Sequence, residues 1–272
     1  MRRELTEQEK QKSYAKFFDM PYPEVAAETL ELMKEPMDPA LALPIQQRTD
    51  LLKPGYLERE AGYCVMPDGS GYVASYVKMP GVTLEMLEWW FAWHGMESLR
   101  YKIWDPNDHY EAHVSRRHLK QRLDPSLNDR EKNWNTSDFV LENVGEGTLP
   151  LRISFRSPES FGFDKKEFES RKVTAICAHS GPPDWDIPRT TFIHFGRKTE
   201  DGIELRTRFW LGYMIVNKQA VRTEFELDLR RVAGLAQHSP KEYTRLAAML
   251  PQLYAENHGI EDKLEDLIPI EL

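Results

Sequence analysis

The sequence contains very little cysteine. Its 272 residues include only Cys64 and Cys177, which lie far apart, and neither belongs to a C-x-x-C pair. Two cysteines cannot build a disulfide framework for a chain of this length, and a cysteine-based zinc site is excluded. This low cysteine content is typical of a reducing compartment and predicts a cytoplasmic protein.

The sequence also lacks long apolar runs and an excess of positive charge. No segment approaches the roughly 18 apolar residues of a membrane-spanning helix, and the charged amino terminus, MRRELTEQEKQKS, does not have the pattern of a secretory signal. The formal net charge is −8. We therefore expect neither a nucleic-acid partner nor binding to an anionic membrane. The composition is otherwise that of a globular protein.

The first 55 residues differ from the rest because they are rich in Glu, Lys and Pro. A short helix with a proline start is predicted within residues 22–33, and Pro39 and Pro44 interrupt the chain after it. We interpret residues 1–55 as an arm with short helices that packs on the main body or, in a homodimer, on a partner subunit. Residues 56–272 are long enough to form one large domain.

The first half of the main domain is predicted to mix strands with helices. Residues 71–77 have the composition of a strand, and Thr83 begins a helix that runs to about His94. Residues 99–104 are predicted as a further strand. A turn over residues 105–108 and a charged helix or loop over residues 116–132 follow.

From Ser137 onward the pattern changes to serial strands. They are predicted over residues 138–144, 151–156, 173–179, 190–195, 203–215 and 222–229. Arg206 and Arg208, opposite an apolar face, are predicted to be solvated. Helical spacing then relates Glu242, Leu246, Met249 and Leu253. Strands without a βαβ rhythm, followed by a long helix, predict an α+β fold in which a curved antiparallel sheet wraps around the C-terminal helix, the helix-grip arrangement.

One short stretch concentrates aromatic and metal-binding side chains. Glu88 to His113 contains four of the seven tryptophans and three of the eight histidines. Buried His and acidic groups need a partner, and a metal ion is one such partner. We therefore hypothesise that His109 is the first ligand of a divalent metal in an aromatic-lined pocket. His113 is an alternative ligand, and His109 could instead support the preceding turn.

Further ligand candidates lie far along the chain. Glu142 lies on the apolar face of its strand, where a carboxylate needs a partner, and a cation is one such partner. His238 and Glu242 are four residues apart, so a helix would place both within reach of one ion. A capping box over residues 239–242 is the alternative, with the helix starting at Pro240 because proline in a helix interior costs roughly 3 kcal/mol.

Other polar side chains could contact a substrate. His179 and His194 are predicted on the apolar faces of neighbouring strands. Both are either satisfied core residues or donors to a substrate oxygen at the polar end of a cavity. Tyr101 and Tyr213 are similar candidates.

Five segments carry a family resemblance. They are WWFAWH at 89–94, RYKIWDPNDH at 100–109, DFVLENVG at 138–145, RFWLG at 208–212 and HSPKEYTRLAAMLPQLY at 238–254. In this order they resemble the 2,4-diacetylphloroglucinol hydrolase family, which includes phloretin hydrolases. The first and last segments are the most specific. Residues before about 55 show no clear match.

The resemblance implies a zinc-dependent hydrolase of carbon–carbon bonds on a helix-grip, Bet v 1-like fold. It implies an aromatic, polyketide-like substrate, cleaved between an acyl group and a phloroglucinol-type ring to give the deacylated phenol and a carboxylic acid. The family's metal ligands fall on His109, Glu142, His238 and Glu242. Its substrate-contacting region falls near Tyr101, His179 and His194. Ala112 and His194 depart from the family pattern, which indicates a different acyl-phenol.

Two other functions compete with this interpretation. A helix-grip carrier would bury the same His and Glu residues as ion pairs and perform no chemistry. A metal enzyme of the same fold could instead catalyse a cyclisation or the retro-Claisen cleavage of a β-diketone. Two imidazoles and two carboxylates also tolerate several divalent ions besides zinc.

Overall fold

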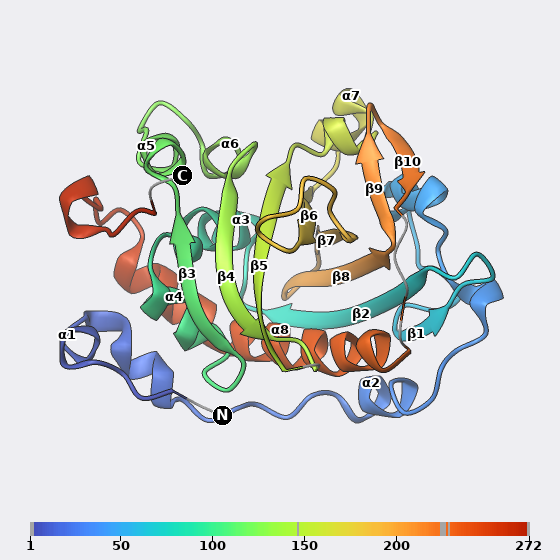
Figure 1. Cartoon of the computed structure of the whole chain (residues 1–272), viewed down its shortest axis with the longest axis horizontal. Coiled ribbons are helices and arrows are strands. Elements are labelled where there is room, and N and C mark those ends of the chain that lie inside the picture. Colours follow the sequence, from blue (N-terminus) through green and yellow to red (C-terminus); the bar gives the residue numbers. More distant parts are fainter. Residues whose placement is uncertain (1–2, 146, 224–226, 228, 271–272) are drawn as a thin grey trace.

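The computed structural model describes residues 3–145, 147–223, 227 and 229–270. Its centre is an eight-stranded antiparallel sheet with the order β1-β2-β8-β7-β6-β5-β4-β3. The strands are β1 Gly62–Val65, β2 Gly71–Pro80, β3 His109–Val114, β4 Ser137–Asn143, β5 Thr148–Arg156, β6 Val173–Gly181, β7 Thr190–Lys198 and β8 Gly202–Leu211. Figure 1 shows β3 to β5 crossing the direction of β2 and β8 at a steep angle, so the sheet is strongly curved.

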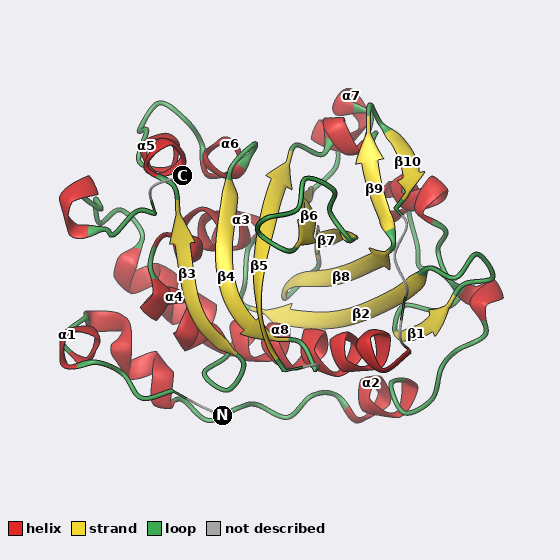
Figure 2. Cartoon of the chain, in the orientation of Figure 1, coloured by secondary structure: helices red, strands yellow, loops and turns green. Residues whose placement is uncertain are grey.

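Helices surround this sheet (Figure 2). The α-helices are α1 Glu7–Lys10, α2 Ala27–Leu32, α3 Leu84–Trp93, α4 Ser98–Trp104, α5 Arg116–Arg122, α6 Asp129–Asn133, α7 Lys165–Ser170 and α8 Leu229–Asn257. The 3₁₀ helices are η1 Ser13–Asp19, η2 Pro39–Leu41, η3 Ile45–Leu52, η4 His94–Met96, η5 Glu159–Phe161 and η6 Leu264–Asp266. The predicted α+β class, the curved antiparallel sheet and the long C-terminal helix are confirmed, and the arrangement is compatible with a helix grip.

Three predicted elements differ from the structure. Residues 99–104 belong to helix α4, not to a strand. All six are buried, so no exposed side of the helix revealed its helical period in the sequence. The strand predicted over 203–215 breaks at Gly212, whose φ of 91° ends β8 before β9, Tyr213–Val216. Of the described residues in the predicted strand 222–229, only Arg222 is in a strand, at the end of β10, Gln219–Arg222. Residues 224–226 and 228 lie outside the described residues.

Helix α8 runs through Pro240 without a break. The alternative in which Ser239 caps a helix that starts at Pro240 is therefore wrong. The Ser239 side chain is fully buried, and its hydroxyl lies 2.9 Å from that of Ser75 in β2. Because α8 packs along β2, tertiary contacts offset the cost of a proline in the helix interior.

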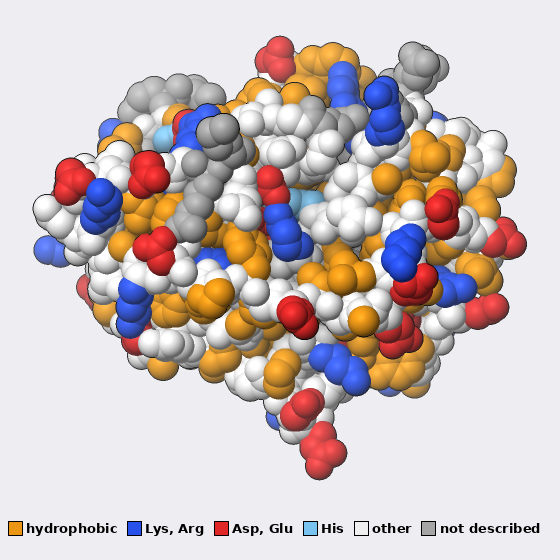
Figure 3. Space-filling model, turned by 90° about the horizontal axis from the view of Figure 1, so that it is seen from below, with side chains coloured by type: hydrophobic (Ala, Val, Ile, Leu, Met, Phe, Trp, Pro, Cys, Tyr) orange, Lys and Arg blue, Asp and Glu red, His pale blue; other side chains and the backbone are white. Residues whose placement is uncertain are grey.

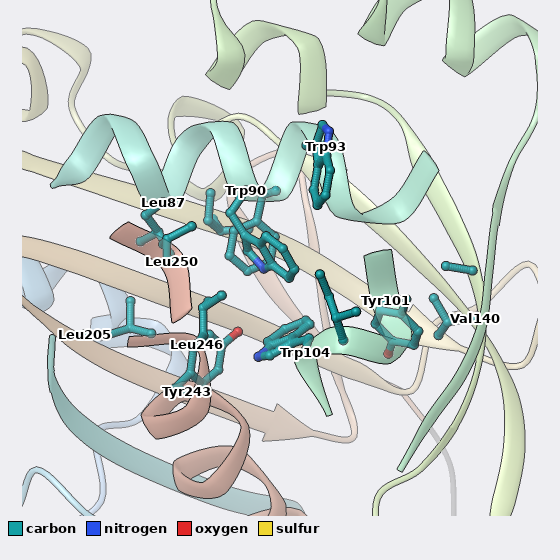
Figure 4. Packing of buried hydrophobic residues seen from close by; sticks show 14 of the residues in the cluster. Leu87, Trp90, Trp93, Tyr101, Trp104, Val140, Leu205, Tyr243, Leu246 and Leu250 are labelled. Carbon is teal, nitrogen blue, oxygen red and sulfur yellow. The ribbon is translucent and has the colours of Figure 1, made fainter. Parts of the chain in front are cut away.

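Both faces of the sheet are covered by protein. The inner face, as we call the one toward α3, α4 and α8, carries the larger core. Figure 4 shows Trp104 of α4 beside Tyr243 of α8 and below Trp90 of α3, and the centroids of these two rings lie 5.4 and 5.7 Å from that of Trp104. The outer face packs on a second core, which includes residues of η3, η5 and α7.

This second cover explains why Arg206 and Arg208 are not solvated, contrary to the prediction. Both are almost completely buried on the outer face of β8. Each guanidinium forms an ion pair with the Glu60 carboxylate, and Arg206 also donates to the carbonyl oxygen of Leu51. Burial opposes ionisation of Glu60, but the two arginines outweigh it and lower the pKa of this carboxyl.

The amino-terminal 55 residues contribute to both cores. Phe17 and Phe18 of η1 join the inner core, and Arg245 of α8 donates hydrogen bonds to carbonyl oxygens of this segment. Leu51 and Leu52 of η3 join the outer core. The segment therefore packs on the main body, while the domain boundary at residue 55 stays a prediction.

Charged side chains are mixed on the surface. On the face that Figure 3 shows, Lys and Arg side chains are dispersed among acidic ones. Within the described residues, no helix combines the length and apolar character needed to cross a membrane.

We predict that Glu60→Ala lowers the free energy of unfolding by about 3–5 kcal/mol, because it leaves two buried guanidinium groups without their carboxylate. Chemical denaturation of the purified protein measures this change. Glu58→Ala, at an exposed position nearby, should stay within about 0.5 kcal/mol of the parent. Equal, small effects of both substitutions would contradict the pairing.

Candidate metal centre and substrate cavity

The four predicted metal ligands converge from three elements. His109 and Glu142 are cross-strand partners in β3 and β4, and His238 and Glu242 lie one turn apart on α8. The Nε2 atom of His109 lies 3.5 Å from Glu242 Oε2 and 3.8 Å from Glu142 Oε2. His238 Nε2 lies 3.5 Å from the same Glu242 oxygen. Tetrahedral ligands about 2 Å from one ion are ~3.3 Å apart, so these separations suit a shared cation.

A β-bulge orients His109 toward this cluster. The pairing of β3 with β4 shifts register between His109 and Glu111. His109 and Ala112 are three positions apart, so a regular strand would place them on opposite faces, but the extra residue of the bulge puts both on the inner face. His113 points elsewhere: its imidazole is one-third exposed and lies 3.8 Å from Glu111. The structure thus brings His109, and not His113, to the other three side chains.

The cluster is buried, and the pKa of each of its four side chains is shifted. All four side chains are at least nine-tenths inaccessible. Burial lowers the pKa of His109 to about 3, so this imidazole is neutral and can act as a ligand. Burial raises the pKa of the Glu142 and Glu242 carboxyls. Burial works against protonation of His238, but Glu242 and Asp108 outweigh it and raise the pKa of this imidazole.

Buried polar atoms without hydrogen bonds mark the same place. They are Nε2 of His109 and Nδ1 of His238. Leaving such atoms unpaired costs roughly 1–3 kcal/mol each. Two imidazoles and several carboxylates are also a donor set that zinc and related divalent ions accept. The residues present therefore fit a bound cation.

Asp105 is a candidate ligand that the sequence analysis assigned only to a turn. Single atoms of Asp105, His109 and His238 lie within 4.8 Å of one another. Asp105 already has partners, however: it accepts a hydrogen bond from Tyr22, and the ammonium of Lys241 lies 2.8 Å away. Each ring nitrogen of His238 thus faces a carboxylate, Nε2 toward Glu242 and Nδ1 toward Asp105 at 3.9 Å. The acidic turn directly before His109 was the available signal.

Tyr101 of α4 lies against the cluster. Its ring is stacked on His109 with centroids 4.0 Å apart, and its hydroxyl donates a hydrogen bond to Glu142. Its backbone carbonyl lies 3.3 Å from His109 Nδ1. Burial, reinforced by Glu142, raises the pKa of Tyr101 well above its ordinary value, so the phenol keeps its proton.

A cavity of about 310 Å³ opens from the cluster. Its walls are mainly apolar, and the aromatic residues Phe91, Tyr101, Trp104, Phe155, Phe192, Phe209 and Tyr243 line it. This size and lining are typical of small-molecule sites. His194 lines the cavity, and so does His94, which the sequence analysis did not select. Nδ1 of His194 is hydrogen-bonded to the hydroxyl of Thr207 at 3.0 Å, so Nε2 is the ring nitrogen that can face the cavity.

His179 does not line this cavity, so the alternative in which His179 and His194 lie at the polar end of one cavity is wrong. The register pairs His194 with Ile176 and His179 with Thr191. Because side chains alternate along a strand, the two histidines lie on opposite faces of the sheet. His179 does lie on an apolar face, as expected, but that face packs against Phe161 of the second core. Tyr213 is also remote from the cavity, and its hydroxyl donates to Asp68.

The fold and this site define an α+β protein with a small-molecule pocket and a candidate metal centre at its floor. The chain belongs to the DAPG hydrolase PhiG domain family, whose model matches residues 43–255. The family resemblance is thereby confirmed, and it extends before residue 55, where none was expected.

Named relatives match nearly the whole chain. Phloretin hydrolase of Eubacterium ramulus is 35% identical over 260 residues, which cover 93% of each chain. The 2,4-diacetylphloroglucinol hydrolase of Pseudomonas protegens is 29% identical over 265 residues, covering 90% of this chain and 84% of the relative. A protein of the same name from Pseudomonas sp is also 29% identical. These relatives are hydrolases by name, which supports an enzyme.

We predict that Lys241→Met lowers the free energy of unfolding by about 3–5 kcal/mol, because Asp105 is completely buried and loses its cation. Thermal and chemical denaturation measure the change, with the exposed Lys120→Met as the control. Adding Asp105→Asn to Lys241→Met should recover part of the loss. An unchanged double variant would show that the pair is not the cause.

Proposed function

We propose that this protein is a zinc-dependent hydrolase that cleaves the carbon–carbon bond between an acyl group and a phloroglucinol-type ring. The products are the deacylated phenol and a carboxylic acid. The observation that carries the proposal is the convergence of two imidazoles and two carboxylates at the floor of an aromatic cavity. The names of the relatives favour this reaction over a carrier without chemistry and over cyclisation or retro-Claisen cleavage of a β-diketone.

His109, Glu142, His238 and Glu242 would hold the ion. Two carboxylates face the unpaired Nε2 of His109, whereas Asp105 is already neutralised by Lys241. Asp105 and Asp108 lie on the Nδ1 side of His238, where one of them would accept a hydrogen bond from Nδ1 and orient the ring. A bound zinc ion supplies Lewis-acid polarisation of an oxygen and lowers the pKa of water toward about 7.

The chain's own residues bind and orient the phenol. His194 offers Nε2 to a ring hydroxyl, and because burial lowers the pKa of His194 to about 3, it does so as a neutral imidazole. The Tyr101 hydroxyl, which is hydrogen-bonded to Glu142, would donate its proton to the ring carbon that loses its acyl group, and the proton released by the attacking water would return to Tyr101 through Glu142. The aromatic walls exclude bulk water, which strengthens these polar interactions.

Several broader features belong to the same proposal. The sheet and α8 are suggested to form a helix-grip, Bet v 1-like fold, with residues 1–55 as an amino-terminal arm and residues 56–272 as the hydrolase domain. A homodimer and a cytoplasmic location stay predictions. Size-exclusion chromatography with light scattering tests the homodimer.

We predict that the purified protein contains about one zinc ion per chain and releases a carboxylic acid from an acylphloroglucinol. His109→Ala and Glu242→Gln should each lose most of the metal and at least 100-fold in kcat/KM, because a tetradentate site loses one of its bonds. Metal analysis by mass spectrometry and product chromatography on the same sample measure both quantities.

His113→Ala is the matched control, since His113 lies in the same strand but outside the cluster. It should keep the metal and the activity. Loss of metal from His113→Ala but not from His109→Ala would overturn the assignment. A metal-loaded protein that hydrolyses no acylphloroglucinol in a broad panel would overturn the reaction.

We predict that His194→Gln lowers kcat/KM about 10- to 100-fold, because it removes a hydrogen bond to the substrate in a water-poor cavity. His179→Gln, on the opposite face of the sheet, should change kcat/KM less than about threefold. Steady-state kinetics with one acylphloroglucinol measure both variants, and melting temperatures verify folding. Equal losses in the two variants would contradict the positions that we assign to them.

A further inference from the structure

A second pocket, of about 160 Å³, lies on the outer face of the sheet. Arg152, Ser154, Arg156 and His179 line it with polar groups. The loop between β6 and β7 and strand β9 supply its other walls, which include Pro182, Trp185, Pro188, Met214 and Ile215. Figure 1 shows this loop between β5 and β9. The pocket shares only Gly181 and Pro182 with the large cavity.

Alternation along β5 separates the two pockets. Leu151, Ile153 and Phe155 face the large cavity, whereas Arg152, Ser154 and Arg156 face the outer pocket. His179 joins them because it is the cross-strand partner of Ser154. The sheet therefore lies between the outer pocket and the candidate metal centre.

The two arginines bring positive charge without an acidic partner. Arg152 donates one hydrogen bond to the carbonyl oxygen of Trp185, and Arg156 donates one, of 2.8 Å, to that of Phe155. A guanidinium has five N–H donors, so most donors of Arg152 and Arg156 can bind a ligand. Among the residues that the structure describes, neither arginine forms an ion pair, although Asp186 also lines the pocket. Burial lowers the pKa of Arg156, and the charge of Arg152 lowers it further.

His179 adds a directed donor. Its ring is nine-tenths buried, and its Nε2 accepts a hydrogen bond of 2.9 Å from the backbone N–H of Ile215. The neutral imidazole therefore carries its proton on Nδ1. Within the described part of the chain, Nδ1 has no hydrogen-bond partner. Burial, with Arg156 nearby, lowers the pKa of His179 to about 4, so the imidazole is in its neutral form at neutral pH.

We propose that this outer pocket binds the carboxylate of a small organic acid. Two guanidinium groups and the Nδ1–H of His179 would hold the carboxylate, for which a planar guanidinium is a fitting partner. The indole of Trp185 and the side chain of Met214 would cover the apolar part of the acid. The volume is about ten times what one water needs, so a bare inorganic oxyanion would leave much of the pocket unfilled.

Isothermal titration of the full-length protein with benzoate tests this site without any turnover. We expect saturable binding whose Kd rises at least tenfold in Arg156→Gln and in Arg152→Gln. Arg117→Gln removes the same charge from an exposed position on α5 and should leave Kd within about twofold. Benzamide, which has the same shape but no charge, should bind at least tenfold more weakly than benzoate.

Three outcomes would overturn the proposal. Benzoate binding that survives in both arginine variants would show that the pocket is not its site. Binding that is lost in His194→Gln but kept in Arg156→Gln would place benzoate in the large cavity. Inorganic phosphate that binds as tightly as benzoate, with the same loss in Arg156→Gln, would replace the organic acid by a simple oxyanion.

Discussion

A carboxylate or an imidazole that leaves water needs a countercharge or a hydrogen-bond partner, and this requirement governs the interior of the protein. Glu142, Glu242, His109 and His238 are all buried on the inner side of the sheet. No single element could bring them together. The β-bulge in β3, the register of β4 and the unbroken path of α8 through Pro240 are each needed for their atoms to approach within 4 Å.

The polar shell behind the cluster follows from the same requirement. Lys241 lies three residues after His238 on α8 and neutralises Asp105 and Asp108, which face the Nδ1 side of that histidine. Trp104 closes the shell by donating its indole N–H to the carbonyl oxygen of Glu242. Lys241, Asp105 and Asp108 do not line the cavity, whereas Trp104 does, so the candidate ligands are oriented both from behind and from the cavity wall.

Sequence patterns predicted an element correctly where its polar residues face outward or where a capping residue marks its start. Thr83 caps α3 as predicted, and the alternation of β5 was visible because its polar residues face outward. They failed where both sides are buried. In β8 nine of ten residues are buried, so the apolar side was found but the cover over Arg206 and Arg208 was not. Strands β6 and β7 are also buried on both faces, so the pattern did not show that His179 and His194 lie on opposite faces of the sheet.

The candidate ligand set was identified largely through family resemblance, because spacing alone cannot relate residues 109 and 142 to residues 238 and 242. The H-x-x-x-E pair on α8 was visible, but Pro240 favoured a local capping box instead. Tertiary packing outweighs the local preference for a capping box, because Ser239 contacts Ser75 across the helix–sheet interface. Asp105 was overlooked because a turn explains an aspartate equally well without any buried partner.

One strand also gives the two sides of the sheet opposite chemistry. The inner side of β5 is apolar, and the histidines near it are neutral because burial lowers the pKa of His94 and His194 to about 3. The outer side of the same strand is cationic. The aromatic walls beside the candidate metal centre suit an uncharged phenolic ketone, whereas an anion would lose its hydration there; Arg189 and Arg231 also line this cavity. The outer pocket differs in that Arg152 and Arg156 converge there with His179 from neighbouring strands, and this convergence is the reason for proposing it as the site of an organic acid.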